Sequence, residues 1–463
     1  MDDHSERRTA LLLAMLSSFI TPFMASSINI GLPDIADEFK MNAVLLSWVP
    51  TSYLLAAAVF LVPFGRIADI HGRKKVFLYG MWLFTFGTVL CALAPSSWFL
   101  ISSRVVQGMG GAMVFGTSIA LLTSVYPLHE RGKVLGMSVS ITYLGLSMGP
   151  FLGGFLTGAL GWRSIFVFVL PIAAVVIAVG SLRLQGEWAD SKGERFDLTG
   201  SAMYALSLTG VILGFSLLPD VSGAIATLAG VVGIGMFVFW ESRQSRPVLD
   251  MQLFRHNKTF AFSNMAALIN YCATFAVAFL MSLYLQYVKE LTPQEAGVIL
   301  VAQPVVMAAF SPLAGKLSDV IEPRVIASIG MAISAVGLAF LSLMVEETAI
   351  WMIAASLAVL GFGFALFSSP NMNAIMSSVE RRSYGVASST VGTMRLVGQV
   401  LSMGIATLFI SVYVGSTELA HELAPEFLTS FRLSFTLFAA MCFIGVLASL
   451  ARGNVRKESP DRL

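Results

Sequence analysis

Polar side chains inside the apolar runs of this sequence are the residues whose chemistry could serve a function. Two arginines, Arg104 and Arg395, fall inside such runs. A charge in hydrocarbon costs at least about 2.5 kcal/mol, so such residues usually face the protein interior or a water-filled cavity. Either arginine could bind a solute, although Arg104 could also be a packing device tied to backbone carbonyls. The interior polar set is Asn29, Arg104, Gln107, Tyr143, Asn270, Tyr271, Gln303 and Arg395.

Groups that carry out covalent chemistry are absent from the middle of these runs. All 27 acidic residues fall in segments assigned to loops or helix ends, and the five histidines fall in loops. The sequence has no phosphate-binding Gly-Lys-Ser/Thr loop, so ATP-driven work is unsupported. It also lacks a Cys/His metal spacing. We expect no enzyme activity, no cofactor and no metal, and we interpret Cys91, Cys272 and Cys442 as packing residues.

The composition is typical of a chain that crosses a bilayer many times. Of its 463 residues, 56% are hydrophobic and 12% are charged, whereas soluble chains carry about 25% charged residues. The net charge of +2 gives no indication of nucleic-acid binding. Apolar runs of about 20 residues each span a bilayer as helices. The sequence therefore predicts an all-α polytopic membrane protein.

A charged stretch between two long apolar runs organises the chain. It reads GRIADIHGRKK from Gly65 to Lys75, and GKLSD repeats its pattern from Gly315 to Asp319. Basic loops stay on the cytoplasmic side, and paired motifs at a long offset indicate an internally duplicated transporter. Two unrelated basic turns are the alternative. The residues expected to control conformation here are Gly65, Asp69, Gly72, Arg73, Gly315 and Asp319.

The first stretch resembles the signature loop of the major facilitator superfamily, Gly-x-Leu-Ala-Asp-Arg-x-Gly-Arg-Lys. The second copy falls where that family repeats the loop, although Ile70 stands where the family prefers Arg. The resemblance implies two six-helix bundles that alternate access to a central cavity. It also implies that Asp69 abuts the start of the eleventh bundle helix, here near 383–385, and latches the cytoplasmic side closed.

Three helix motifs extend the resemblance to drug:proton antiporters. The run 10–32, expected to be a retained first membrane helix, ends like that of fourteen-helix exporters, but the family's acidic position falls on Met24. The pair Arg104 and Gln107 matches the family's helix-4 motif, which is linked to proton transfer or substrate charge. We add Met24 to the expected substrate-binding residues.

The fifth helix carries the most specific match, which resembles the family's antiporter motif. Glycines four residues apart let neighbouring helices approach closely, and an internal proline removes a backbone hydrogen bond and permits a bend. The motif therefore predicts a hinge, with ordinary close packing as the alternative. Its conformational residues are Gly145, Gly149, Pro150 and Gly154.

Two additional apolar runs, 198–218 and 224–240, indicate the fourteen-helix branch. Twelve-helix members lack them. We expect an N-terminal six-helix bundle at 1–183, a linker with the inserted helix pair at 184–258, and a C-terminal six-helix bundle at 259–463. The inserted pair is interpreted as a spacer or lipid-facing anchor.

These observations predict a secondary transporter that exports hydrophobic or amphiphilic compounds by alternating access with proton antiport. A carrier of lipid-like molecules, an uncoupled facilitator and a non-transporting sensor or scaffold are the alternatives. Because the interior holds arginines and no carboxylates, we expect neutral or anionic amphiphiles to be preferred over dications. We expect a monomer in the cell membrane, without nucleic-acid partners. Most Lys and Arg fall in segments that would place both termini in the cytoplasm.

Proton coupling needs a group that changes charge during the cycle, and arginine is effectively always protonated. Asp34, just beyond the outer end of the first helix where Pro33 breaks it, is the best-placed candidate there. A solvated loop or helix-cap role is the alternative for Asp34. Asp69 and Asp319 are the candidates at the other end of the molecule.

Overall fold

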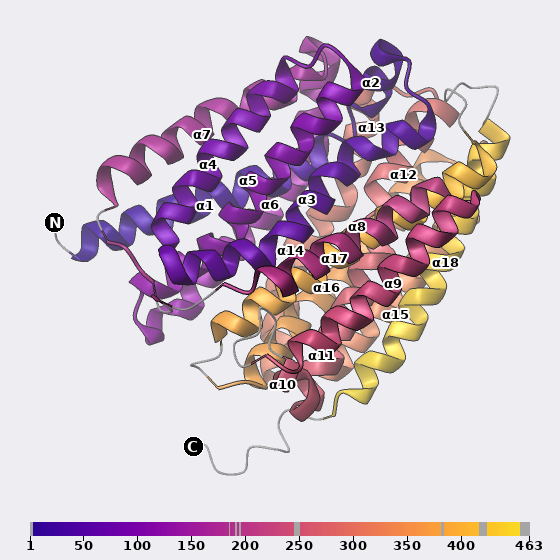
Figure 1. Cartoon of the computed structure of the whole chain (residues 1–463). Coiled ribbons are helices and arrows are strands. Elements are labelled where there is room, and N and C mark those ends of the chain that lie inside the picture. The colour runs from indigo at the N-terminus through magenta and orange to yellow at the C-terminus, as the bar shows by residue number, and fades with distance from the viewer. Residues whose placement is uncertain are drawn as a thin grey trace.

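The computed structural model describes residues 3–184, 186–189, 192–193, 196–244, 251–380, 384–415 and 424–453. Fourteen helices in these ranges are long and apolar enough to cross a membrane, which confirms the predicted all-helical fold. The first six lie at one side of the molecule (Figure 1). They are α1 (Asp3–Ser27), α3 (Ala43–His71), α4 (Arg73–Ala92), α5 (Ser97–Val125), α6 (Leu128–Leu160) and α7 (Arg163–Arg183).

The inserted pair and the second set of six spans complete the molecule. The pair is α8 (Leu198–Leu217) and α9 (Val221–Glu241). The spans that follow are α11 (Lys258–Thr274) with α12 (Val277–Leu283) and η1 (Tyr284–Val288), α13 (Pro293–Leu300) with α14 (Ala302–Val320), α15 (Pro323–Ser342), α16 (Ile350–Ser377), α17 (Tyr384–Tyr413) and α18 (Ala424–Ala451). Two short helices, α2 (Leu32–Phe39) and α10 (Met251–His256), lie between spans.

Several helix boundaries differ from those expected. The first helix ends at Ser27 instead of reaching residue 32, and a separate helix α2 begins at Leu32. Pro33 occupies the first turn of α2, where its missing N–H costs nothing. The second membrane helix, whose apolar run predicts a start near Trp48, begins at Ala43 because the Asn42 side chain accepts from Leu45 N at 2.7 Å and caps it.

The two sets of six spans meet along α3, α6, α13 and α17 (Figure 1). We call the end that carries α2 and the start of α13 the outer end, and the end that carries Gly72 the inner end, after the predicted topology. The division into 1–183, 184–258 and 259–463 stays a prediction.

The inserted pair packs across the seam between the two bundles. Tyr204 of α8 donates from its hydroxyl to the Ala58 carbonyl of α3 at 3.0 Å. Ser411 of α17 donates to the Leu218 carbonyl, just after α8, at 2.7 Å. Helix α9 covers α8 and keeps a largely exposed apolar outer face, as a lipid-facing helix would. The spacer interpretation therefore describes α9 better than α8.

Candidate functional site

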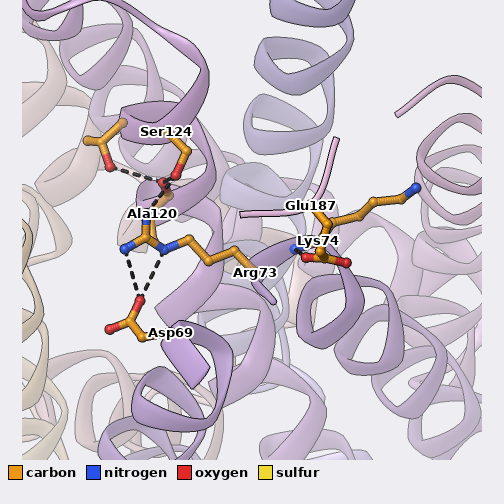
Figure 2. Close-up of polar contacts among 7 residues, drawn as sticks. Asp69, Arg73, Lys74, Ala120, Ser124 and Glu187 are labelled. Carbon is orange, nitrogen blue, oxygen red and sulfur yellow. Dashed lines mark hydrogen bonds and ion pairs between the residues drawn. The ribbon is translucent and has the colours of Figure 1, made fainter. Parts of the chain in front are cut away.

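The signature loop is held by contacts inside its own bundle (Figure 2). Asp69 Oδ1 accepts from Arg73 Nε at 3.0 Å and from Arg73 Nη2 at 2.9 Å. Arg73 Nη1 donates to Ser124 Oγ of α5 at 2.6 Å. Both of these bonds to Asp69 come from Arg73 and not from the predicted partner segment 383–385. Residue 383 of that segment lies outside the described residues. Asp69 therefore pairs with Arg73 in this conformation.

Glu187, which sequence reasoning missed, closes the same loop from the linker (Figure 2). Its Oε1 accepts from the backbone N–H of Lys74 at 3.0 Å, in the first turn of α4. An anion is favourable at a helix N-terminus. Gly72 has φ +121°, and a Cβ there would overlap the Glu187 carboxylate. Only glycine suits position 72, for both conformational and steric reasons.

The second copy of the motif is also satisfied within its own bundle. Asp319 Oδ1 accepts from Asn373 Nδ2 of α16 at 3.2 Å, and the same Nδ2 donates to Ser318 Oγ at 2.9 Å. Gly315 faces Ser369 of α16. The contacts of the two motif copies therefore tie helices within each half.

The glycine motif of α6 makes two kinds of close contact. Gly145 packs on the Phe19 carbonyl of α1, and Gly149 packs on Ser26 of the same helix. Gly154 instead faces α13, where an added Cβ would lie 2.5 Å from the Pro293 carbonyl oxygen. The Pro150 carbonyl faces Gly297 of α13. The motif thus joins α6 to its own bundle and, nearer the outer end, to the opposite bundle.

Hydrogen bonds reinforce this contact between bundles at the outer end. Ser282 Oγ donates to the Asn29 carbonyl at 2.6 Å, and Gln286 Nε2 donates to the next carbonyl, of Ile30, at 3.1 Å. Thr407 Oγ1 of α17 donates to Ser47 Oγ of α3 at 2.9 Å. Three separate helix contacts therefore bridge the bundles at this end.

Arg104 is sealed inside the first bundle. Its side chain is 1% exposed and stacks on the Tyr53 ring at 4.4 Å. Its Nε donates to the Val49 carbonyl at 3.1 Å, and its Nη1 donates to Gln107 Oε1 at 2.5 Å. Gln107 Nε2 in turn donates to Thr88 Oγ1 of α4 at 2.8 Å. This arrangement matches the packing alternative for Arg104.

Arg395 lies between the bundles in a different setting. Its guanidinium lies 4.5 Å from the centroid of the Phe115 ring, which belongs to the opposite bundle. Nearby, Tyr143 Oη of α6 and Ser368 Oγ of α16 form a 2.7 Å hydrogen bond across the same interface. Of the two membrane arginines, only Arg395 therefore lies where the bundles meet.

The remaining expected binding residues are scattered around this region. Asn270 is fully buried, and neither side-chain polar atom has a partner among the described residues. Asn29 donates weakly to the Ala25 carbonyl at 3.4 Å. Met24 is fully buried, whereas Gln303 is half-buried. The sequence does not show that these residues line one pocket, and their roles in substrate binding stay predictions.

A third arginine, Arg452, follows the last apolar run, where the sequence predicts a cytoplasmic segment, but it is 1% exposed. Its Nη1 donates to Asn371 Oδ1 at 2.8 Å and to Ser263 Oγ at 3.2 Å. Helix α18 ends at Ala451, so the length of its apolar run alone predicts that Arg452 lies in a loop. Its burial depends on polar partners in α11 and α16 that the run of α18 cannot reveal.

Asp34 lies in the first turn of α2 at the outer end and is half-buried. Burial raises the pKa of the Asp34 carboxyl above its ordinary value, and the nearby charge of Asp37 raises it further. Tyr287 of the opposite bundle lies within electrostatic range of both carboxylates. Glu38 anchors α2 through hydrogen bonds of 2.6 Å from both Nη1 and Nη2 of Arg163. Asp34 is thus a titratable group held at the closed end.

Comparison with known proteins gives the same fold. A riboflavin transporter, RibZ of Clostridioides difficile, is 26% identical over 95% of this chain and 96% of its own length. The multidrug resistance protein Stp of Mycobacterium tuberculosis is 30% identical over 89% of this chain and 78% of its own. A solved structure from work on substrate recognition in proton dependent oligopeptide transporters superposes with a TM-score of 0.65 at 14% identity, covering 97% of this chain and 98% of its own.

The family model described as Major Facilitator Superfamily matches residues 14–240 and 264–462. Together these ranges cover most of the fourteen spans, including both copies of the signature loop. The family consists of secondary transporters of small molecules and is not an enzyme family. The chain belongs to the major facilitator superfamily.

Proposed function

We propose that this protein exports hydrophobic or amphiphilic compounds by alternating access, coupled to proton antiport, as a monomer in the cell membrane with both termini in the cytoplasm. The observation that carries the proposal is a set of hydrogen bonds between bundles at the outer end, made among the described residues by Ser282, Gln286 and Thr407. Bridging bonds join the outer ends, as at Ser282 and Asn29. Asp69 and Asp319, at the inner ends, accept from Arg73 and Asn373 of their own bundles. This pattern fits an outer-closed member of a two-state cycle.

The substrate class is inferred from the side chains packed between the bundles and from the relatives. Phe364, Tyr271 and Met307 belong to a packed apolar cluster that Tyr143 of α6 joins, and methionine and aromatic side chains can repack around varied ligands. The names of the two relatives, a riboflavin transporter and a multidrug resistance protein, support a small organic substrate. A lipid-like substrate is the second candidate within the same mechanism.

Asp34 is the proposed proton-coupling residue. Met24, where the resemblance expects an acid, cannot titrate, and the described spans hold acids only near their ends. The raised pKa of Asp34 moves its titration toward physiological pH. Its place on α2 lets protonation act on the contacts that close the outer end. Asp69 and Asp319 remain the inner alternatives.

Purified protein in liposomes with an imposed pH gradient tests this function. Movement of riboflavin and of dansyl-labelled amphiphiles would be followed by fluorescence. We expect transport that depends on the gradient and is lost in Asp34→Asn. Transport that ignores the gradient would remove coupling and leave an uncoupled facilitator. A protein that moves no tracer under any gradient would be the scaffold or sensor of the alternative interpretation.

A further inference from the structure

Arg395 is a cation at mid-span that lacks a counter-charge from the protein. It follows Tyr384, the first residue of α17, by eleven positions, which is about 16 Å along a helix. In the described spans, Asp and Glu occur only near helix ends, as at Asp69 and Asp319. The charge of Arg395 is therefore not neutralised by a carboxylate at its own depth.

The hydrogen-bond donors of Arg395 are also unused. Its Nε is buried and donates to no described residue, and the guanidinium makes neither a hydrogen bond nor an ion pair within the described chain. Its guanidinium stacks on Phe115 and lies within electrostatic range of the Tyr53 and Tyr143 hydroxyls, none of which carries a charge that would neutralise it. Arg104 differs in each respect, because the Val49 carbonyl and Gln107 accept from it and it is 1% exposed.

A guanidinium carries five N–H donors in a fork that matches the two oxygens of a carboxylate. Leaving the buried Nε–H of Arg395 unmet is costly, and an anionic partner would remove that cost. We infer that Arg395 binds the anionic group of the transported amphiphile, with a carboxylate as the best geometric match. This inference rests on the proposed transport function and specifies the substrate charge.

The surroundings of Arg395 suit the rest of such a molecule. Phe115 offers an aromatic face from the opposite bundle, and the Tyr143 and Ser368 hydroxyls are hydrogen-bonded to each other within electrostatic range of the guanidinium. These hydroxyls are uncharged and would not repel an anion. A cationic ligand would instead meet Arg395 with no acid to balance it. The site therefore favours organic anions over cations of similar size.

Equilibrium binding to the full-length purified protein tests the inference. Three probes share one fluorophore and differ in charge. Dansylglycine is an anion, dansylglycinamide is uncharged, and dansylcadaverine is a cation. Fluorescence titration would give the Kd of each. We expect the wild type to prefer dansylglycine, and Arg395→Gln to weaken that probe about tenfold or more. The same variant should leave the neutral probe within about twofold.

Two further variants separate charge, geometry and folding. Arg395→Lys keeps the charge without the fork, so we expect a smaller loss for dansylglycine than in Arg395→Gln. Arg432→Gln, which removes an arginine elsewhere in the same bundle that donates to the Met344 carbonyl, should leave the preference unchanged. Thermal unfolding of each variant reports folding separately.

The inference is overturned if the wild type does not prefer the anion, or if Arg395→Gln weakens all three probes equally. The second result would give Arg395 a structural role. Because no gradient is present, the outcome does not depend on proton coupling. Failure of gradient-driven transport with anion binding intact would overturn the proposed function alone.

Discussion

At the scale of single residues, the position of each charge relative to the bundle interface separates its roles. Arg104 and Arg395 look equivalent in the sequence, yet the first is sealed inside one bundle and the second lies between two. Asp34 is held on a short helix by the Glu38–Arg163 pair at the closed end. Among these, Asp34 is the residue whose pKa is raised, first by burial and then by the charge of Asp37.

Protonation of Asp34 is expected to favour the outer-closed form. Its pKa is raised in this form, so the closed form binds a proton more tightly than an open, hydrated form does. As pH falls toward the raised pKa, closure should therefore strengthen; as pH rises above it, closure should weaken. Labelling of Leu300→Cys, at a buried position of α13, by an impermeant maleimide in a background without Cys91, Cys272 and Cys442 would measure outer accessibility.

The Asp34→Asn variant should remove this pH dependence and keep the closed form populated at high pH. Asp220→Asn, in the turn between α8 and α9, serves as the control and should retain the wild-type profile. A profile unchanged in Asp34→Asn would show that another group titrates.

At the scale of elements, α6 and α13 approach closely at the outer end, and we expect this contact to stabilise closure there. Gly154 allows this contact because hydrogen is its only side chain, and Pro150 faces Gly297 one turn earlier. At the other end, Asp69 and Arg73 of the signature loop tie α3 to α4 and, through Ser124, to α5. Each prediction below changes one of these contacts.

Gly154→Ala is expected to open the outer end. A Cβ at 2.5 Å from the Pro293 carbonyl oxygen cannot be accommodated unless α6 and α13 separate. Outer accessibility of the Leu300→Cys reporter should rise severalfold. Gly235→Ala in α9 is the matched control, because no atom lies within 4 Å of the added Cβ. Equal accessibility in both variants would argue against a steric role for Gly154.

Asp69→Asn is expected to shift the population toward forms with an open inner end. Loss of the carboxylate removes the anion that the family resemblance places against the start of α17. It also weakens the bonds to Arg73 seen in this conformation. Labelling of a cysteine introduced at Val125, the last residue of α5, would measure inner accessibility. If labelling stays at the wild-type rate, the latch hypothesis fails.

At the scale of the whole molecule, the inserted pair links the two bundles along one seam. Helix α8 is tied to α3 by Tyr204, and the turn after α8 is tied to α17 by Ser411 (Figure 1). If the bundles move relative to each other, either these two hydrogen bonds lengthen or the pair moves with one bundle. We call the pair a brace because these bonds oppose separation of α3 from α17.

Removing both ties, with Tyr204→Phe and Ser411→Ala, should destabilise the protein by about 1 kcal/mol, taking about 0.6 kcal/mol for each interhelical bond. Thermal unfolding in detergent would detect the change. Thr436→Ala, whose hydroxyl donates to the Arg432 carbonyl of its own helix, is the control for loss of a hydroxyl. A double variant as stable as this control would mean that the two bonds contribute nothing to the brace.

The sequence by itself determined the fourteen spans, the duplicated signature loop and the family, because apolar length and local motifs are properties of contiguous residues. It also located the glycines of α6, since spacing along one helix fixes which residues share a face. Only the tertiary structure distinguished buried Arg104 from Arg395, buried Arg452 and brought Glu187 to the start of α4. Those outcomes depend on which distant helices supply partners, and no local pattern encodes that choice.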